Sequence, residues 1–472
     1  MAALARFLIC LNGDDAKSSP LPTTSTIAVD APPAPLPATQ RRADISARRA
    51  ELHGPGDWSA LLDPLDADLR DELLKYGDLA QATYDGFDSR YWSPDCGTCL
   101  HGLRRLLPAL GLDGHGYVAT TFVYATCAGV RVPRFLQRPL HADAWDGTNW
   151  FGYVAVAGAA EAKRLGCRDI VVAWRGTIAP GEWLLDMRTR MVPFEVDAGK
   201  DKGARVAEGF HSIYTSSSSR DTTTAGKSKL GERSAREQVA DELARLVAHF
   251  RGRGEEVCVT VTGHSLGGAL ALLAARDAAA AHPGVPVTAV TFSAPRVGNR
   301  AFCAGLTSRG VKVLRAFVRH DVVPSVPSVP RVVVDAPVSK ALAMLWALTG
   351  RSPSWAYVHV GDELELDVKR SPYLKQNAYD VVGFHNLETC LHLLDGRESA
   401  AGEFRRGASR DPALVNKTSG MLCDLLRVPP WWYEPANKGL VRDAASGRWV
   451  VAERPLDDVP VPDDRLQLSE LD

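Results

Sequence analysis

The sequence lacks the features of a membrane-spanning, a nucleic-acid-binding or a disulfide-rich secreted protein. No apolar run approaches the roughly 20 residues that a transmembrane helix needs. Lysine and arginine total 55 and aspartate and glutamate 56, so the formal net charge is -1 and no basic excess indicates nucleic acid as a partner. Nine cysteines, an odd number, are scattered over 472 residues. That usage favours a reducing compartment over a secreted disulfide framework.

A metal site is also poorly supported by the sequence. Cys96 and Cys99 have the spacing of a zinc or redox motif, but no second Cys/His pair follows nearby. We therefore expect two structural thiols, no metal and no cofactor. The remaining composition, 45% hydrophobic and 24% charged, is ordinary for a globular protein.

The N-terminal region has few acidic residues and no hydrophobic periodicity. Residues 18–39 are rich in Pro, Ser, Thr and Ala, and their one acidic residue is Asp30. We expect residues 1–45 to be a disordered tail that serves as an organelle transit segment, because they are hydroxyl-rich and followed by several arginines. A chloroplast address is the prediction. A mitochondrial address, or a simple tail on a cytoplasmic protein, are the alternatives.

Beyond the tail, strand patterns alternate with helix patterns, which predicts an α/β fold with a mixed central sheet flanked by helices. Residues 46–400 are expected to form one domain of this α/β class, and residues 401–472 an extension wrapped on its core. A polar insertion interrupts the domain at 216–234. Apolar or alternating runs predict strands at 117–125, 150–157, 170–174, 257–262, 287–292 and 313–318. Helices are predicted at 66–84, 161–165, 234–250 and 270–281.

A serine stands between two glycines where one of these strands becomes a helix. The stretch is Gly263-His264-Ser265-Leu266-Gly267. A turn this tight strains the central residue and brings strand and helix so close that only hydrogen fits at Gly263 and Gly267. Ser265 should then present an exposed hydroxyl beside the backbone N–H of Leu266, at the positive end of a helix. A nucleophile beside a preorganised anion donor is typical of acyl transfer.

A serine nucleophile needs a base, and the base needs an orienting carboxylate. Asp321 follows the strand predicted at 313–318 and is the expected acid, with Asp335 as its rival. His385 lies in a loop just before a helix and is the expected base. His359, between Val358 and Val360 in a predicted strand, and His392 are the alternatives.

Two further elements complete the expected site. Thr177 ends a central strand, and its N–H could supply a second oxyanion donor beside Leu266. The segment after it carries apolar residues edged by charges and reads either as an amphipathic lid over the site or as ordinary core helix. The lid residues would be Trp183, Leu184, Leu185 and Met187.

These residues together resemble a known family. GHSLGGAL, WRGT, SAPRVGN, HDVVP and HNLETCLHLLDG are similar to motifs of the class 3 lipases. Residues 52–88 and the tail motifs RDPALVNKTSGMLCDLLRVPPWW and NKGLVRDAASGRW resemble plant phospholipases A1 of the DAD-type acylhydrolase group, class I. The resemblance spans roughly residues 51–451. It implies a lipase-type α/β-hydrolase fold and a plastid location. It also implies removal of the sn-1 acyl chain from phosphatidylcholine, galactolipids or triacylglycerol, with Ser265, Asp321 and His385 as the triad.

Two other functions are compatible with such a fold. One is a non-catalytic signalling or scaffold protein, which commonly keeps the serine but loses a partner or blocks the pocket. The other is hydrolysis of a small soluble ester, against which an apolar lid argues. Because every chemical part has a candidate, we expect an enzyme whose partner is a membrane glycerolipid.

Overall fold

The computed structural model describes residues 43–53, 58–90, 93, 95–126, 148–177, 190–194, 202–217, 232–327, 356–376, 380–405, 407–433, 440–442, 449–451, 460–461 and 464–471. Most of the predicted tail at 1–45, most of the insertion at 216–234, the four predicted lid residues and Asp335 lie outside these ranges.

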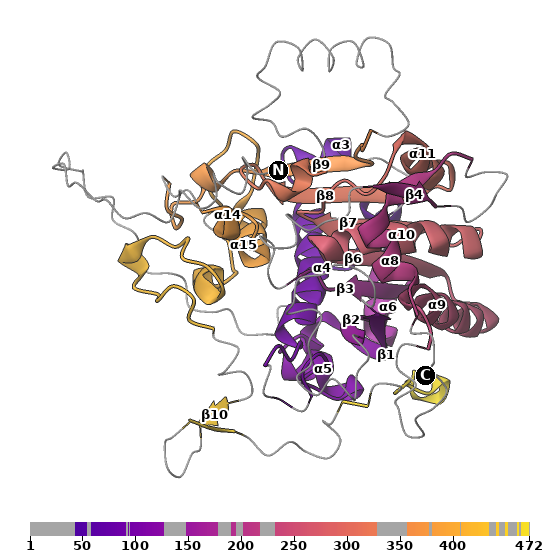
Figure 1. Cartoon of the computed structure of the whole chain (residues 1–472). Coiled ribbons are helices and arrows are strands. Elements are labelled where there is room, and N and C mark those ends of the chain that lie inside the picture. Colours follow the sequence, from indigo (N-terminus) through magenta and orange to yellow (C-terminus); the bar gives the residue numbers. More distant parts are fainter. Residues whose placement is uncertain are drawn as a thin grey trace, which may run out of the picture.

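Within the described residues, seven strands form one mixed sheet in the order β1-β2-β3-β6-β7-β8-β9 (Figure 1). The strands β1 to β3 are antiparallel, and each later neighbour is parallel to the one before it. This confirms the mixed α/β sheet. The strands are β1 (Tyr117–Thr126), β2 (Thr148–Ala157), β3 (Arg168–Trp174), β6 (Val257–His264), β7 (Val287–Phe292), β8 (Lys312–Val318) and β9 (Asp362–Leu366).

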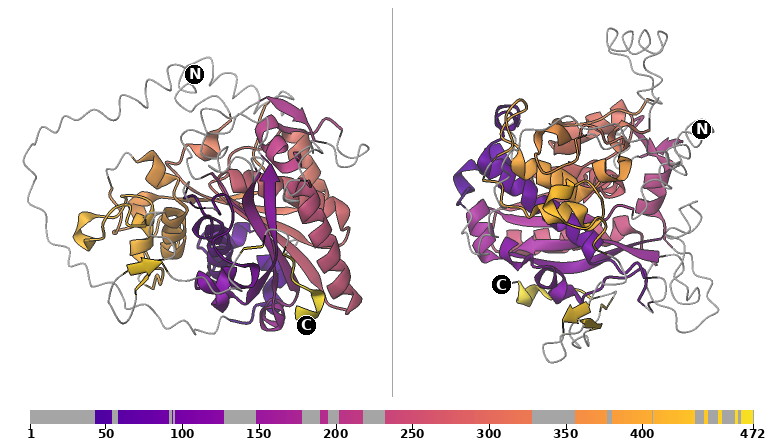
Figure 2. Two further views of the ribbon diagram at one scale, coloured as in Figure 1. Left: turned by 60° about the horizontal axis from the view of Figure 1, so that its bottom comes forward. Right: turned by 90° about the vertical axis from the view of Figure 1, so that its left-hand side faces the viewer.

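Helices cover both faces of this sheet. The helices α4 and α15 pack together on one face, and α8, α9 and α10 cover the other, as Figures 1 and 2 show. The helices are α2 (Arg49–Leu52), α3 (Ser59–Leu62), α4 (Ala67–Asp85), α5 (Leu106–Ala109), α6 (Ala159–Leu165), α8 (Glu208–Thr215), α9 (Ala235–Gly252), α10 (Leu266–Ala281), α11 (Arg300–Ser308), α14 (Val381–Phe384) and α15 (Leu387–Gly396).

The alternation of side chains along β3 explains why two separate cores form. Val171 and Ala173 belong to the apolar cluster beneath α4 and α15, whereas Ile170, Val172 and Trp174 belong to the cluster beneath α9 and α10. Successive strand residues point to opposite faces, so a strand covered on both sides reads as a continuous apolar run. The run IVVAW was predicted on that basis and is fully buried.

Two long helices begin where side chains cap them. Asp66 accepts from the N–H of Leu69 at the start of α4. Ser234 and Glu237 form a reciprocal capping box at the start of α9. Each cap satisfies N–H groups that have no partner inside the helix, so the helix has a defined first residue.

Short elements complete the described fold. Two small sheets pair β4 (Met191–Pro193) with β5 (Arg205–Ala207) and β10 (Leu440–Arg442) with β11 (Trp449–Val451). Single 3-10 turns lie at η2 (Ser46–Arg48), η3 (Leu103–Arg105), η4 (Asp113–His115), η5 (Val323–Ser325), η6 (Val368–Arg370), η7 (Pro412–Lys417), η8 (Asp424–Leu426) and η11 (Leu468–Glu470).

The C-terminal residues contact the domain at two places. Residues 411–433 carry η7 and η8 and lie against α15. Near the end of the chain, Leu466 N–H donates to the carbonyl of Thr120, so the last residues run beside the edge strand β1. A covered edge cannot pair with another chain.

Two sequence expectations need correction. His359 does not lie in a strand, because β9 begins three residues later at Asp362, and Val358 makes only an isolated bridge to Gly298. One disulfide, Cys167–Cys258, joins the starts of β3 and β6, although the scattered cysteines suggested none. Parallel pairing of the two strands places Asp169 opposite Cys258 and so brings Cys167 within reach of Cys258. The two cysteines are 91 residues apart in the sequence, so the sequence alone does not reveal the pairing.

None of the described helices is long and apolar enough to cross a bilayer.

Candidate active site

The turn from β6 to α10 has the strained geometry that the two glycines predict. Ser265 has φ 58° and ψ -125°, a backbone conformation that side-chain-bearing residues rarely adopt. A Cβ on Gly263 would lie 2.5 Å from the carbonyl carbon of Gly267, so β6 and α10 touch at this point. A Cβ on Gly267 would instead overlap the backbone of Trp174, which shows that this glycine clears β3 rather than β6.

Ser265 is fully buried, which corrects the expectation of an exposed hydroxyl. Its N–H donates to the carbonyl of Phe292, and Gly176 lies in contact with its side chain. The imidazole of His385 lies within hydrogen-bond distance of the Ser265 hydroxyl. Ser265 is therefore surrounded by the ends of neighbouring strands and by the loop that carries His385. The serine motif alone does not predict this burial, because the surrounding residues come from other parts of the sequence.

The structure brings Ser265, His385 and Asp321 together from three separate segments. His385 Nε2 lies 2.8 Å from Ser265 Oγ, and His385 Nδ1 lies 2.8 Å from Asp321 Oδ2. A carboxylate only accepts hydrogen bonds, so Nδ1 carries the proton and Nε2 is left to accept the serine hydroxyl proton. This tautomer is the one that a general base for Ser265 needs.

Local structure fixes both partners of the serine. Asp321 follows β8, and its second oxygen accepts from the N–H of Val323 at 2.9 Å, so the carboxylate is held on both sides. His385 lies between α14 and α15. The side chain of Asn386 caps α15 by accepting from the N–H groups of Glu388 and Thr389. The end of β8 and the start of α15 therefore place Asp321 and His385 at the same end of the sheet.

Two residues that sequence reasoning missed lie directly behind this triad. His264 Nε2 is 2.8 Å from the backbone carbonyl of His385, and its Nδ1 is 2.7 Å from the hydroxyl of Tyr84 on α4. The carbonyl can only accept, so Nε2–H donates to it and Nδ1 accepts from Tyr84. Burial holds the pKa of His264 well below its ordinary value, so the ring stays neutral.

Tyr84 also contacts the other side of the site. Its hydroxyl accepts a hydrogen bond from the backbone N–H of Gly176, one residue before Thr177. Burial raises the pKa of Tyr84, so the phenol keeps its proton. His264 directly precedes Ser265 in the serine motif, and this position could have predicted that it contacts the site. Tyr84 gives no local signal, because it lies 180 residues away in an ordinary amphipathic helix.

Thr177 and Leu266, the expected oxyanion donors, are both buried beside the serine. Leu266 begins α10, where the first N–H groups have no partner inside the helix. Arg175 fixes the end of β3 by donating to the carbonyl of Trp150 at 3.0 Å, with its guanidinium 3.8 Å from the centre of the Phe87 ring. The arginine of the WRGT motif therefore supports the backbone of the site.

The other histidines that the sequence offered as bases lie elsewhere. His359 Nε2 contacts the carbonyl of Pro324 at 2.7 Å, and His392 Nε2 contacts the Ser371 hydroxyl at 2.8 Å. Neither reaches Ser265. Burial lowers the pKa of His359 to about 3 and that of His392 to about 4, so both are neutral in the folded protein near pH 7. Asp335 and the predicted lid residues lie outside the described residues.

Cys96 and Cys99 are both buried, and neither forms a disulfide. Burial raises the pKa of Cys96 to about 11. Among the described residues, no group of three or more His, Cys, Asp or Glu side chains is arranged to hold a metal ion.

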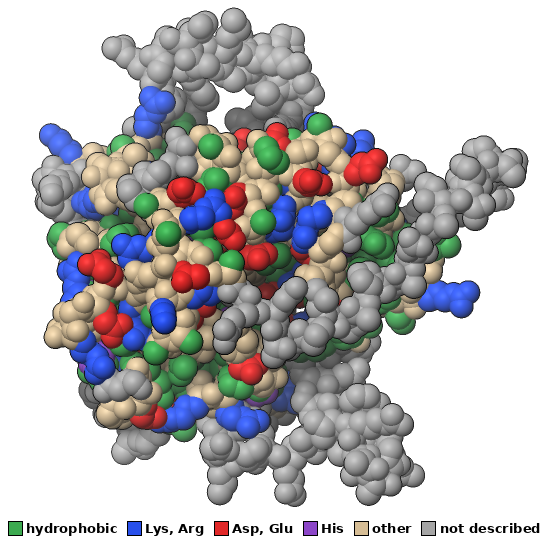
Figure 3. Space-filling view, turned by 180° about the vertical axis from the view of Figure 1, so that it is seen from behind, with side chains coloured by type: hydrophobic (Ala, Val, Ile, Leu, Met, Phe, Trp, Pro, Cys, Tyr) green, Lys and Arg blue, Asp and Glu red, His purple; other side chains and the backbone are tan. Residues whose placement is uncertain are grey.

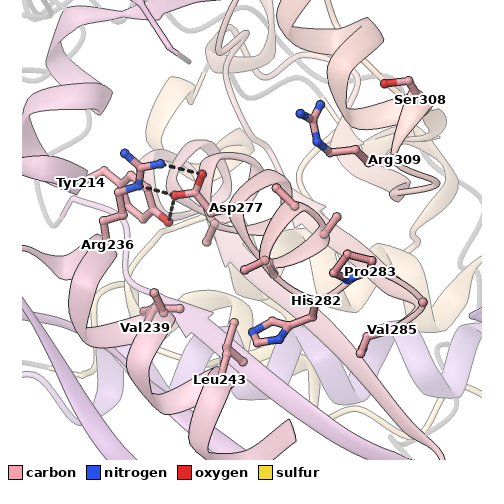
Figure 4. Close-up of a pocket in the computed structure, with 17 residues that line it drawn as sticks. Tyr214, Arg236, Val239, Leu243, Asp277, His282, Pro283, Val285, Ser308 and Arg309 are labelled. Atoms are coloured by element: carbon pink, nitrogen blue, oxygen red, sulfur yellow. Dashed lines mark hydrogen bonds and ion pairs between the residues drawn. The ribbon is translucent and has the colours of Figure 1, made fainter. Parts of the chain in front are cut away.

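A cavity of about 580 Å³ lies away from the triad, at the far end of α10 (Figure 4). Residues of α9, of the C-terminal half of α10 and of the end of α11 line it. In this cavity the Asp277 carboxylate accepts from Arg236 Nε at 2.6 Å and from the Tyr214 hydroxyl at 3.0 Å, so it is paired with two other lining residues. Ser265 lies at the opposite end of the same helix, so this cavity is not the site of the triad.

Comparison with known proteins gives a consistent family. Residues 171–330 match the class 3 lipases. The chain is 41% identical over 435 residues to phospholipase A1-Igamma1, chloroplastic, of Arabidopsis thaliana, across 89% of this chain and 81% of the relative. It is also 41% identical over 435 residues to phospholipase A1-II 6 of Oryza sativa subsp. japonica, across 88% and 97%. A solved lipase from Rhizopus microsporus var. chinensis aligns with 66% of this chain and 78% of its own, at 22% identity and a TM-score of 0.39.

Proposed function

Because the chain belongs to the class 3 lipases of the plant phospholipase A1 type, we propose that it removes the sn-1 acyl chain of membrane phospholipids through an acyl-enzyme on Ser265. The relatives in Arabidopsis and rice are both named phospholipase A1. Phosphatidylcholine is the substrate we propose first, with galactolipids and triacylglycerol as further candidates.

The observation that carries the proposal is the unbroken hydrogen-bonded chain from Ser265 through His385 to Asp321, with 2.8 Å at each link. Nucleophile, base and orienting acid are each within hydrogen-bond reach of the next, and the base has the correct tautomer. A scaffold protein on this fold has no need of such an arrangement.

In the proposed reaction, Ser265 Oγ attacks the sn-1 carbonyl carbon while its proton passes to His385 Nε2. The imidazolium that forms is stabilised by Asp321, whose carboxylate stays ionised. Collapse of the tetrahedral intermediate breaks the ester C–O bond, and His385 returns the proton to the leaving lysophospholipid oxygen. Water then attacks the acyl-serine with the same base, which releases the fatty acid and restores Ser265.

The charge on the tetrahedral oxygen would be met by backbone N–H groups. We propose Leu266 at the start of α10 and Thr177 at the end of β3 as the donors. Donors fixed in advance by a strand and a helix need no reorganisation when the charge develops, which is the main advantage of such a site. A metal ion is not part of this proposal, because the N–H groups and the imidazolium balance the charge.

The residues that would cover the site remain a prediction. Trp183, Leu184, Leu185 and Met187 follow Thr177 and are proposed to form an amphipathic lid that opens against lipid. Replacing Trp183 and Leu184 by Ser should lower turnover of phospholipid vesicles far more than turnover of a soluble short-chain ester. Equal losses on both substrates would mean that the segment is core.

A chloroplast location is also proposed, with support from the name of the Arabidopsis relative and from the composition of residues 1–45. The rice relative is equally similar over nearly all of its own length, and its name states no compartment. The location therefore rests on the N-terminal residues, and not on the catalytic domain.

A serine-directed fluorophosphonate probe tests the assignment of the nucleophile. Ser265→Ala should lose both labelling and phospholipid hydrolysis, whereas Ser293→Ala should keep both. Ser293 is a matched control, since it is buried, has φ 47° and follows the neighbouring strand β7. Labelling of Ser265→Ala at the wild-type rate would show that the nucleophile is another residue.

A further inference from the structure

Most of the large apolar side chains that the described residues leave exposed lie at the catalytic end of the molecule. Seven are at least 40% exposed, and Val118 and Val461 lie on or near the β1 edge of the sheet. The other five, here called the apolar rim, are Val322, Val382, Leu425, Trp431 and Trp432. Val322 directly follows the acid Asp321, and Val382 lies on α14, three residues before the base His385. Single exposed apolar residues are common, but a cluster beside a site is not.

The tryptophans belong to residues 411–433, which are tied to the histidine loop by side-chain and backbone contacts. Asn386, the residue after His385, donates from its amide to the Thr418 hydroxyl at 2.8 Å. The N–H of Trp431 donates to the carbonyl of Ser419 at 3.0 Å. Met421 lies directly against Gly383 on α14. The position of the tryptophans is therefore fixed relative to the triad.

The geometry of these side chains presents apolar surface to the outside. Leu425 is 79% exposed, and Trp431 is half exposed on a backbone with φ 54°, in the left-handed region. The indole N–H of Trp432 donates to the carbonyl of Ala413 at 2.8 Å, so its one polar atom is satisfied within the protein. An exposed apolar ring with a satisfied polar atom can enter the boundary between headgroups and acyl chains without losing a hydrogen bond.

The charged groups on either side of Leu425 do not oppose contact with lipid. The acid beside Leu425 is Asp424, and Lys375 Nζ lies 3.1 Å from its carboxylate. Arg427, two residues after Leu425, is exposed. The described charges on either side of Leu425 are therefore one ion pair and one arginine.

We propose that the apolar rim docks the protein on the surface of a glycerolipid bilayer, so that a substrate molecule reaches Ser265 from the membrane. This inference rests on the proposed function. Contact at Val322 and Val382 would place the bilayer beside the acid and the base, and the tryptophans would anchor the same end from the C-terminal residues. The rim consists of loop residues and short turns from three segments, which fits shallow insertion better than the continuous groove or helix face used to bind a peptide.

Vesicle flotation tests the docking surface separately from catalysis. In the Ser265→Ala background, where the substrate is not consumed, Leu425→Ser with Trp431→Ser should lower the partition coefficient for phosphatidylcholine vesicles at least tenfold. Val118→Ser with Val461→Ser is the matched control, because it removes two exposed apolar residues that lie on or near the β1 edge, outside the apolar rim, and should leave partitioning unchanged. Equal partitioning of the two double variants would overturn the proposal.

Turnover with the serine intact supplies the second half of the test. Leu425→Ser with Trp431→Ser should lose most of its activity on vesicles and keep its activity on a soluble short-chain ester. Loss of both activities by the same factor would assign these residues to support of the histidine loop and would also overturn the proposal. If Ser265→Ala still hydrolysed phospholipid, the proposed function would fail while the flotation result kept its meaning.

A second inference rests on different contacts. We infer that Tyr84 and His264 are positioning residues that hold the base and the oxyanion strand in register. Tyr84 accepts from the N–H of Gly176 and donates to His264 Nδ1, and His264 donates to the carbonyl of His385. One phenol therefore links the end of β3 to the loop of the base. Without it, the neutral ring of His264 has no reason to keep its proton on Nε2, and the carbonyl of His385 loses a fixed donor.

Tyr84→Phe tests this role, with Tyr153→Phe as a matched control. The Tyr153 hydroxyl donates to the carbonyl of Leu79 on the same helix at 2.8 Å but does not touch the triad. Tyr84→Phe should lower kcat on a soluble ester about tenfold with little change in KM, and should shift the downfield proton resonance of His385 Nδ1–H. Tyr153→Phe should lower the thermal midpoint by about as much as Tyr84→Phe does. It should leave kcat and the His385 Nδ1–H resonance unchanged. A kcat for Tyr84→Phe equal to that of Tyr153→Phe would contradict the inference.

Discussion

At the scale of the residue, the histidines are distinguished by what they are bonded to. His385 joins an acid to a hydroxyl, whereas His264 donates to a backbone carbonyl and accepts from a phenol. His359 instead contacts the backbone carbonyl of Pro324. The sequence favours His385 as the base because it lies on a loop before a helix. The hydrogen bonds that distinguish it from the other histidines involve residues more than 60 positions away, which the sequence does not show.

The triad should behave as a unit in kinetics. We expect Ser265→Ala and His385→Ala each to reduce turnover by on the order of 10⁴-fold or more, and the double variant to be no worse than either. The covalent path needs both residues, so removing the second costs nothing further. Initial rates on one soluble ester measure all three variants. Losses that multiply in the double variant would show that the two residues act independently.

His359 should affect stability rather than catalysis, and in a pH-dependent way. Burial, with Arg315 and Arg296 nearby, lowers its folded pKa to about 3 from an ordinary value of 6.5. Between these values the unfolded chain binds a proton that the folded protein does not, so the free energy of unfolding falls as the pH falls below about 6.5. The slope from one such group approaches ~1.4 kcal/mol per pH unit.

His359→Gln removes the titrating group and keeps an amide that can donate to Pro324. Its free energy of unfolding should therefore drop less between pH 7 and pH 4.5 than that of the wild type, by roughly 2 kcal/mol. Turnover at neutral pH should change little. Denaturant unfolding at the two pH values measures the difference. Identical acid sensitivity of the two proteins, or an inactive and well-folded His359→Gln, would contradict this assignment.

At the scale of the element, the strand-to-helix turn depends on clearance at its glycines. A Cβ at Gly263 would meet the carbonyl of Gly267 at 2.5 Å, and one at Gly268 would meet the Cβ of Ala294 at 2.6 Å. The backbone of Gly267 cannot move away from such a Cβ unless α10 moves as a whole. The N–H of Leu266 belongs to the first residue of α10 and would move with it. The packing of α10 and the position of the proposed oxyanion donor, Leu266, are therefore coupled.

Gly263→Ala should lower both stability and turnover. Separating β6 from α10 is expected to cost on the order of 3 kcal/mol or more, and to displace Ser265 enough to abolish activity. Gly252→Ala is the matched control, because Gly252 ends α9 with no atom near its would-be Cβ, so it should keep activity and lose no stability. Thermal midpoints and initial rates test both variants. An active Gly263→Ala with an unchanged midpoint would show that the turn has room for a methyl group.

The elements that the sequence predicted best are those whose periodicity is local. The predicted helix at 66–84 is observed at Ala67–Asp85, and the strand predicted at 313–318 is observed at Lys312–Val318. The strand predicted around His359 was wrong because alternation of Val358 and Val360 reflects packing against the body of the domain and not a ladder of hydrogen bonds. The disulfide and the bonds of Tyr84 depend on which strands and helices become neighbours, and no local pattern encodes that.

At the scale of the whole molecule, charge is evenly mixed and apolar surface is not. Figure 3 shows basic and acidic side chains interspersed over the described surface of one face, in keeping with a net charge of -1. Five of the seven large apolar side chains that the described residues leave most exposed belong instead to the apolar rim. A protein of this kind is expected to bind a bilayer through one end and to show little dependence on long-range attraction to anionic lipid.

The N-terminal residues should act separately from catalysis. Deleting residues 1–42 is expected to leave kcat and KM of the purified protein unchanged, because a Pro-rich, hydroxyl-rich segment contributes little to a packed core. The same residues fused to a fluorescent reporter should direct import into plastids, with an unfused reporter as control. A diffuse cytosolic signal would show that they are only a tail.

The most direct test of the central claim is the position of the ester that is cleaved. Phosphatidylcholine with an unlabelled acyl chain at sn-1 and a deuterated one at sn-2 is offered in vesicles to wild type and to Ser265→Ala, and the products of the first turnovers are resolved by mass. We predict release of the unlabelled fatty acid and of 2-acyl lysophosphatidylcholine by the wild type, and neither product from Ser265→Ala. Release of the deuterated chain first, or equal release by Ser265→Ala, would contradict the account.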